Sequence, residues 1–280
     1  MQTGPVLSPS GSPMSASWWI LPLALALLSG LLCPLAGTLL LVQGRLFQAN
    51  LISHAVLPGL AVALALGLDP GLGGVVSGVA GALLAERFSR PASSGGRGDE
   101  AVLNTVLAGF LGLGVLLIPL LRIRVNLEAV LFGDLLAAGL PDLLRTGLSL
   151  LAVLVLLAFR YRQLVFLGVD PLGAASSGLA VGRLRLLLTL VTALTVVSAM
   201  TAVGVVLVIA LMGAPALLAL EGAISLRQAL LRGALIGSLL AGTGFLLAIQ
   251  PAINLPPGPL IGVLSLLLLP LVLHRRGSAR

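Results

Sequence analysis

The chain is a succession of long apolar runs that are separated by short polar segments. A bilayer core about 30 Å thick needs about 17–25 apolar residues per helix, and several runs reach that length. The runs are continuous and do not alternate, which argues against a membrane β-barrel. The pattern therefore predicts an all-α, polytopic transmembrane helical bundle with about eight or nine spans. The predicted spans cover residues 18–42, 51–68, 72–85, 101–121, 143–159, 186–220, 231–249 and 260–273.

Two parts of this pattern depart from simple crossings. The apolar run 186–220 is too long for one ordinary span and contains Gly204, Gly213 and Pro215, so it predicts two crossings or one crossing and a broken helix. The run within residues 122–142 is too short to cross, which predicts an in-plane or re-entrant piece sheltered by protein or a watery cavity. Loops are predicted for two further polar segments, 86–100 and 160–185.

The ends of the chain differ from the membrane domain predicted for residues 18–273. Residues 1–17 are rich in Pro, Ser and Gly and carry no positive charge, so they predict a disordered tail and no secretory signal. Residues 274–280 form a basic tail. Arginines concentrate on the cytoplasmic side of membrane proteins, and this bias is strongest here when the 86–100 loop and the C-terminus are both cytoplasmic.

Composition supports the membrane class and limits the chemistry. The chain is 58% hydrophobic and 9% charged, which no water-soluble domain of 280 residues could cover with polar surface. All 16 basic residues are arginine, so the lysine that a Walker A loop requires is absent. ATP-driven transport would therefore need another polypeptide. Cys33 is the single cysteine, which excludes an internal disulfide and a cysteine-based metal cage.

The leading candidate for function is a polar interruption at the start of the second span. Asn50 and His54 are four residues apart, so on a helix they share one face. Polar groups inside a membrane are costly and mark ion or substrate pathways. Imidazole suits transition metals, whereas an amide oxygen is a weaker neutral ligand. A structural alternative stays open, in which His54 bonds a backbone carbonyl and Asn50 caps the helix.

The remaining polar candidates have simpler interpretations. Asp69 is predicted to stabilise a tight turn. Glu128 and Asp134 flank the sheltered segment and could face a pathway. Met200 and Met212 are predicted to pack in the core. Solvated loop charge is predicted for three further acids, Glu86, Asp99 and Glu100.

Four stretches of the chain together resemble one family. Residues 53–59, Ser-His-Ala-Val-Leu-Pro-Gly, resemble a signature of the ABC-3 metal permeases, which are the membrane subunits of bacterial zinc, manganese and iron importers. Three further stretches resemble the family's motifs in the same order. These are residues 131–136, 170–178 and 203–216.

This resemblance implies a permease of the ABC importer type and no enzymatic activity. It implies transport of a divalent transition metal, zinc or manganese first and iron next, into a bacterial cell across the plasma (inner) membrane. It also implies a homodimer in membrane lipid, a separate ABC ATPase subunit that uses ATP, and an extracytoplasmic metal-binding protein. No nucleic acid partner and no permanently bound cofactor are expected.

The resemblance also assigns residues. His54 and Asn50 would line the metal pathway, but the family usually has aspartate where Asn50 stands. Either Glu128 or Asp134 could replace that missing carboxylate. An ATPase-docking loop is implied by the last group of matching residues, Asp170, Ala174 and Gly178.

Three other functions stay open on the sequence alone. A permease of the cobalamin or siderophore importer type has a similar many-span bundle and a docking helix. A gradient-driven secondary carrier would need no ATPase, and paired carboxylates inside the membrane would be its expected mark. A membrane enzyme is the least favoured, because only His54 qualifies as a base within a span.

Overall fold

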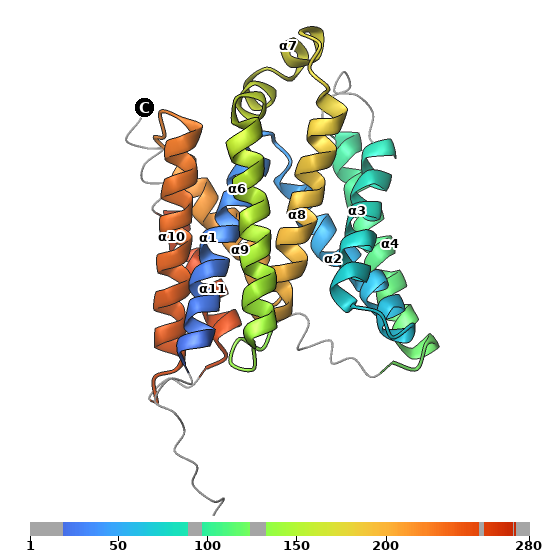
Figure 1. Cartoon of the computed structure of the whole chain (residues 1–280), viewed down its shortest axis with the longest axis vertical. Helices are drawn as coiled ribbons and strands as arrows, with labels where there is room; N and C mark the ends of the chain where they lie inside the picture. Colours follow the sequence, from blue (N-terminus) through green and yellow to red (C-terminus); the bar gives the residue numbers. More distant parts are fainter. Residues whose placement is uncertain (1–18, 89–96, 124–132, 252–254, 271, 273–280) are drawn as a thin grey trace, which may run out of the picture.

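The computed structural model describes residues 19–88, 97–123, 133–251, 255–270 and 272, and over this part of the chain it is a bundle of helices (Figure 1). The predicted tails 1–17 and 274–280 lie outside the described residues. The helices are α1 (Ile20–Val42), α2 (Leu46–Ala65), α3 (Pro70–Phe88), α4 (Arg97–Leu120), α6 (Leu140–Val169), α7 (Pro171–Ser176), α8 (Val181–Val203), α9 (Val205–Leu220), α10 (Leu226–Ala248) and α11 (Pro257–Leu266).

Among the described helices, six are long and apolar enough to cross a membrane, namely α1, α2, α4, α6, α8 and α10. Two shorter apolar helices, α9 and the helix that begins at Pro257, pack among them. The long helices run side by side, and the short α7 stands beyond one end of the bundle (Figure 1). The all-α membrane bundle is therefore confirmed, whereas the count of eight or nine spans stays a prediction.

Helix α6 is much longer than the span predicted to end at residue 159. It continues to Val169, and the predicted loop over residues 160–185 is wrong for most of its length. The extension is amphipathic, because Leu164 and Leu167 are buried on one face while Arg162 is exposed on the opposite face. A helix of 30 residues spans about 45 Å, so it projects beyond a bilayer core of about 30 Å.

The predicted interruption of the run 186–220 is confirmed at Gly204. This residue has φ 81° and ψ 157°, a conformation that only glycine adopts readily, and it separates α8 from α9. Gly213 and Pro215 both lie inside α9 and do not end it. Gly133, with φ +73°, packs directly on this break, and a Cβ added to it would collide with Val203 and Gly204. Gly133 thus shelters against the break between α8 and α9, whereas Asp134, Leu136 and Ala137 are exposed, and residues 124–132 lie outside the described part.

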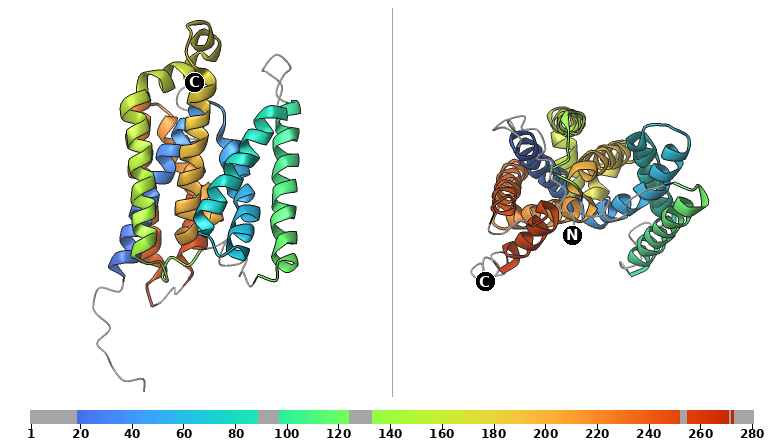
Figure 2. Two further views of the ribbon diagram at one scale, coloured as in Figure 1. Left: turned by 45° about the vertical axis from the view of Figure 1, so that its right-hand side comes forward. Right: turned by 90° about the horizontal axis from the view of Figure 1, so that it is seen from below.

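Close approaches between small residues organise the helices into groups. Helix α2 packs most extensively on α3, where Gly59 and Gly73 face each other so closely that a Cβ on either would collide with the other's carbonyl oxygen. Helix α4 packs on α2 where Gly114 meets Pro58. Helix α1 packs on α6, α9 and α10, and α8 joins this group to α2 and α3. Small residues permit such approaches in membranes. Figure 2 shows the arrangement of the helices from the side and from below.

The contact between Gly133 and the Gly204 break gives the first test. We expect Gly133→Ala to lower the stability of the detergent-solubilised protein by about 1–3 kcal/mol, because alanine disfavours positive φ and its Cβ has no room. Thermal unfolding followed by size-exclusion chromatography measures this. Gly112→Ala is the matched control, because a Cβ on this helical glycine meets open space. Equal melting of Gly133→Ala and wild type would contradict the packing.

Candidate functional site

Helix α2 carries both predicted pathway residues. It begins at Leu46 after an N-cap at Arg45, so Asn50 lies inside the helix and does not cap it. At 100° per residue, the face of Asn50 and His54 is about opposite the face of Ile52 and Val56, which contact α3. Most of α2 is buried, but Asn50 and His54 are only half-buried. The helix thus keeps these two polar side chains partly accessible, on a face that α4 covers one turn further along at Pro58.

His54 offers two atoms with lone pairs, its ring nitrogen Nδ1 and its backbone carbonyl oxygen. Its ring nitrogen Nδ1 is buried and has no hydrogen-bond partner among the described residues. Pro58 follows four residues later and lacks the N–H that would normally bond the carbonyl of His54. A buried acceptor without a donor is costly unless water or a ligand supplies one. The surroundings of His54 therefore suit a passing cation or water.

The sequence predicts that Asp134 or Glu128 supplies the carboxylate that is missing at Asn50, but no described contact joins either of them to His54. Asp134 is exposed, and its Oδ1 accepts a hydrogen bond from the backbone N–H of Ala137 at 3.1 Å, so its described contact is local. Glu128 lies outside the described residues. Within the described part of the chain, no group of three or more His, Cys, Asp or Glu side chains could hold a metal. The metal roles of all four residues stay predictions.

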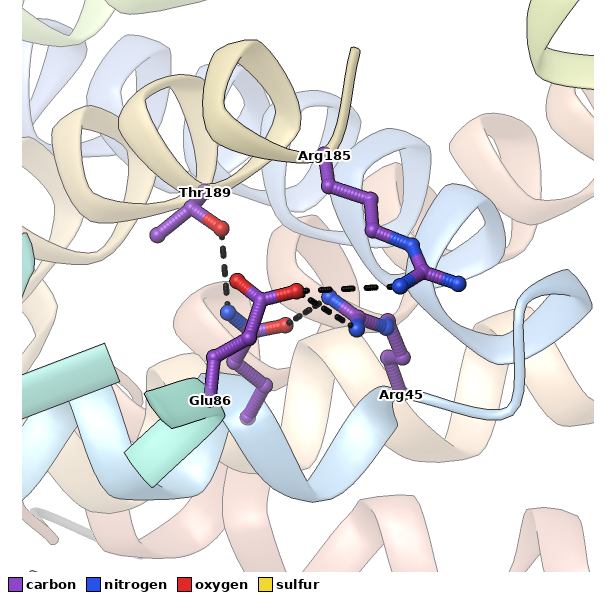
Figure 3. Close-up of polar contacts among 5 residues, drawn as sticks. Arg45, Glu86, Arg185 and Thr189 are labelled. Atoms are coloured by element: carbon purple, nitrogen blue, oxygen red, sulfur yellow. Dashed lines mark hydrogen bonds and ion pairs between the residues drawn. The ribbon is translucent and has the colours of Figure 1, made fainter. Parts of the chain in front are cut away.

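A network of charges at the start of α2, just before Asn50, was not expected from the sequence (Figure 3). Glu86 Oε1 lies 3.0 Å from Arg45 Nη2 and 3.9 Å from Arg185 Nη1. The prediction that Glu86 is solvated loop charge is wrong, because α3 continues to Phe88 and holds the carboxylate between two other helices. No local pattern in the sequence reveals this contact, since Arg45 and Glu86 are 41 residues apart.

A buried hydrogen bond extends this network between α2 and α8. Gln48 Nε2 donates to Thr189 Oγ1 at 3.0 Å, and both side chains are buried. Arg45 donates from Nη1 to Gln48 Oε1 at 3.5 Å. The contacts of Gln48 and Glu86 together link α2, α3 and α8 at the end of the bundle where α2 begins.

Residues 170–178, which resemble one of the family motifs, form helix α7 and its two caps. Asp170 is its N-cap, and its Oδ1 accepts from the backbone N–H of Gly173 at 2.8 Å. Ala174 is fully buried. After the helix, Gly178 has φ +81° and Leu179 N–H donates to the carbonyl of Ala174 at 3.3 Å, which is the geometry of a Schellman C-cap.

The position of α7 suits contact with another protein. It connects α6 to α8 beyond the ends of the long helices (Figure 1). Leu172 on this helix is 84% exposed. A single exposed leucine is common on a protein surface, so the docking role of α7 stays a prediction.

Comparisons with known proteins identify the family. The family model of the ABC 3 transport family matches residues 19–275. The chain belongs to the ABC 3 transport family. Membership makes it a multi-pass membrane subunit of a transporter and not an enzyme.

Named relatives of this ABC 3 family chain come from several organisms. The manganese transport system membrane protein MntC of Halalkalibacterium halodurans is 34% identical over 186 residues, which is 66% of this chain and 62% of that protein. The chelated iron transport system membrane protein YfeC of Yersinia pestis is 27% identical over 66% of this chain and 62% of that protein. An uncharacterised membrane protein of Cyanophora paradoxa is 30% identical over 91% and 85%.

Solved structures confirm the fold of the ABC 3 family chain. A chain of PsaBC from Streptococcus pneumoniae, solved in complex with Fab, matches with a TM-score of 0.81 and 27% identity, covering 92% of this chain and 91% of that one. An ABC transporter chain in an inward-facing conformation matches with a TM-score of 0.65 at 20% identity, covering 96% and 91%. The second likeness shows the fold alone.

The charge network gives the second test. We expect Glu86→Gln to destabilise the solubilised protein by about 1–2 kcal/mol, because it leaves Arg45 and Arg185 facing each other without a carboxylate. Arg185→Gln should cost less, since its nitrogen lies further from Glu86 than that of Arg45. Thermal unfolding in detergent measures both changes.

The neighbouring residue supplies the control for this test. Arg87 is exposed on the same helix turn, so Arg87→Gln should leave the melting temperature near that of wild type. The loss in Glu86→Gln should shrink in high salt, because salt screens the repulsion between the two arginines. A Glu86→Gln variant as stable as wild type would contradict the network.

Proposed function

We propose that this chain is the permease subunit of an ABC importer that carries a divalent transition metal into a bacterial cell, powered by a separate ATPase. The observation that carries the proposal is the half-buried pair of Asn50 and His54 on one face of α2, where Nδ1 of His54 has no hydrogen-bond partner among the described residues. Relatives named for manganese and for chelated iron support a metal as substrate. Nitrogen and neutral oxygen donors together suit manganese or iron, whereas imidazole also suits zinc.

The metal would pass between two copies of the chain. Each copy would turn the Asn50–His54 pair of α2 toward a shared route, since the opposite face of α2 is occupied by α3. Such a route keeps the metal away from lipid, which cannot solvate it. An extracytoplasmic metal-binding protein would deliver the metal at the end opposite α7.

The arginines support a cytoplasmic position for the end that carries α7. Positive residues are enriched on the cytoplasmic side. In the described part of the chain, the end of the bundle opposite α7 has Arg122 and Arg145. The α7 end has Arg45, Arg87, Arg160, Arg162, Arg183, Arg185, Arg227 and Arg232. With α3, α9 and α11 counted as crossings, this orientation also places the C-terminus in the cytoplasm.

The ATPase would dock on α7. Exposed Leu172 and the rigid caps at Asp170 and Gly178 support this role, because a docking element must transmit motion without unwinding. A gradient-driven carrier would have no use for such an element, so α7 favours the ABC importer over that alternative.

Uptake of metal tests the route. In cells that express the complete importer and lack other metal importers, we expect His54→Ala to abolish accumulation of manganese and iron measured by mass spectrometry. Asn50→Asp should raise uptake at low metal concentration, because a carboxylate offsets the charge of a dication.

A polar neighbour on the same helix supplies the control for the uptake experiment. Ser53 is buried, and its Oγ donates to the carbonyl of Ala49 at 2.8 Å, so Ser53→Ala should retain uptake. All variants should reach the membrane in equal amounts. Undiminished uptake in His54→Ala would reject the role of this residue.

Co-purification with the ATPase tests α7. Asp170→Ala removes the N-cap and should weaken α7 by about 0.5–2 kcal/mol, so less ATPase should remain bound. Asp170→Asn keeps a capping oxygen and is the matched control. Loss of binding in both variants would assign the effect to charge, and full binding in Asp170→Ala would contradict the docking role of the cap.

A further inference from the structure

A groove lies on the face of the bundle formed by α3, α6 and α8. Its volume is about 410 Å³, and apolar side chains such as Leu72, Leu148, Leu151 and Leu194 line it. Helices α3 and α6 each pack on α8, so the groove runs over α8 between them. This face is turned to the viewer in Figure 1, with α2 behind α3 and α8. Asn50 and His54 are not among the residues that line the groove.

One end of the groove carries an ion pair. Asp69 precedes α3, and Arg145 lies in the second turn of α6, with 2.7 Å between Asp69 Oδ2 and Arg145 Nη2. Both side chains line the groove and are 38% and 46% exposed. Because α3 and α6 begin at the end of the bundle away from α7, this pair lies at the level of lipid headgroups (Figure 1).

A polar atom lies one helical turn below this pair. Ser149 follows Arg145 by four residues, so both side chains occupy the same face of α6. Ser149 lines the groove and is 5% exposed, and its Oγ has no hydrogen-bond partner among the described residues. A buried hydroxyl without a partner in an otherwise apolar groove points to a ligand that supplies one.

The order of these groups matches a phospholipid. The groove presents a cation and an anion at its end and, further in among apolar walls, the unpaired hydroxyl of Ser149. The other hydroxyl in the lining, that of Ser198, already donates to the carbonyl of Thr195 at 3.2 Å. A phospholipid presents a charged headgroup, then ester oxygens, then acyl chains. Arginine binds phosphate through N–H donors that lie in the plane of its guanidinium, and Arg145 donates to Asp69 from Nη2, so its other N–H groups can donate to a phosphate.

We propose that this groove binds one phospholipid whose headgroup carries both a phosphate and a primary ammonium. The phosphate accepts from Arg145, the ammonium donates to Asp69, and Ser149 donates to an ester carbonyl while an acyl chain fills the groove. An anionic headgroup is disfavoured, because Asp69 would repel it. The bound lipid joins α3 to α6 across α8.

Native mass spectrometry of the full-length, detergent-purified chain tests the proposal. The probes are dioleoyl phosphatidylethanolamine, phosphatidylcholine and phosphatidylglycerol, added to delipidated protein. We expect one phosphatidylethanolamine per chain, retained in preference to the other two. Phosphatidylcholine has no N–H to donate to Asp69, and phosphatidylglycerol has no ammonium, so equal retention of all three overturns the headgroup assignment.

Variants locate the lipid within the chain. Arg145→Gln and Asp69→Asn should each weaken retention by about tenfold or more, because each removes a charge-assisted hydrogen bond. Arg227→Gln, an exposed arginine at the other end of the bundle, is the matched control. Retention that is unchanged in Arg145→Gln overturns the proposal.

A second kind of variant keeps the test valid if loss of the ion pair unfolds the protein. Ala152 lines the groove, and Ala152→Phe should fill it and displace the lipid from a folded chain. Folding is checked by the elution profile and melting temperature. Ala152→Phe that still retains one phosphatidylethanolamine overturns the site, and Ala152→Phe that breaks a dimer assigns the groove to a second copy instead.

Discussion

The structure depends on one constraint, which is that a polar group inside a membrane bundle must find a partner within the protein. Most hydroxyls of the described helices meet it locally, by donating to a carbonyl one turn earlier, as Thr38 does to Pro34 and Thr192 does to Leu188. These groups need no neighbouring helix and carry no functional information. The few that fail the constraint are therefore informative, and His54 and Ser149 are two of them.

The sequence predicted those features that depend on local physics. The long apolar runs indicated the spans, and the conformational freedom of glycine indicated the break at Gly204. The order of the motifs indicated the family, and Asp170 and Gly178 proved to cap α7 as residue types with those preferences do. Met200 and Met212 are buried in the core, as predicted.

Features that depend on distant residues could not be predicted. The extension of α6 beyond residue 159 contains Arg160 and Arg162, which resemble a loop until tertiary packing shows that Leu164 and Leu167 are buried. Glu86 resembled solvated charge for the same reason, since nothing near it in the sequence reveals its partners. The unpaired Nδ1 of His54 is likewise visible only once its surroundings are known.

The positions of the ion pairs suit a transporter whose helices must move. Helix α3 is tied to neighbouring helices near both of its ends, by Glu86 to Arg45 and Arg185 and by Asp69 to Arg145, while small residues such as Gly73 make the contact between. Separating a pair near the membrane surface exposes both charges to water, which solvates them at low cost. Separating a pair in the centre of the bilayer would leave charges in hydrocarbon at a cost of several kcal/mol. Because the charged contacts lie at the ends of α3, either end of this helix can separate from its neighbours without a prohibitive energy barrier.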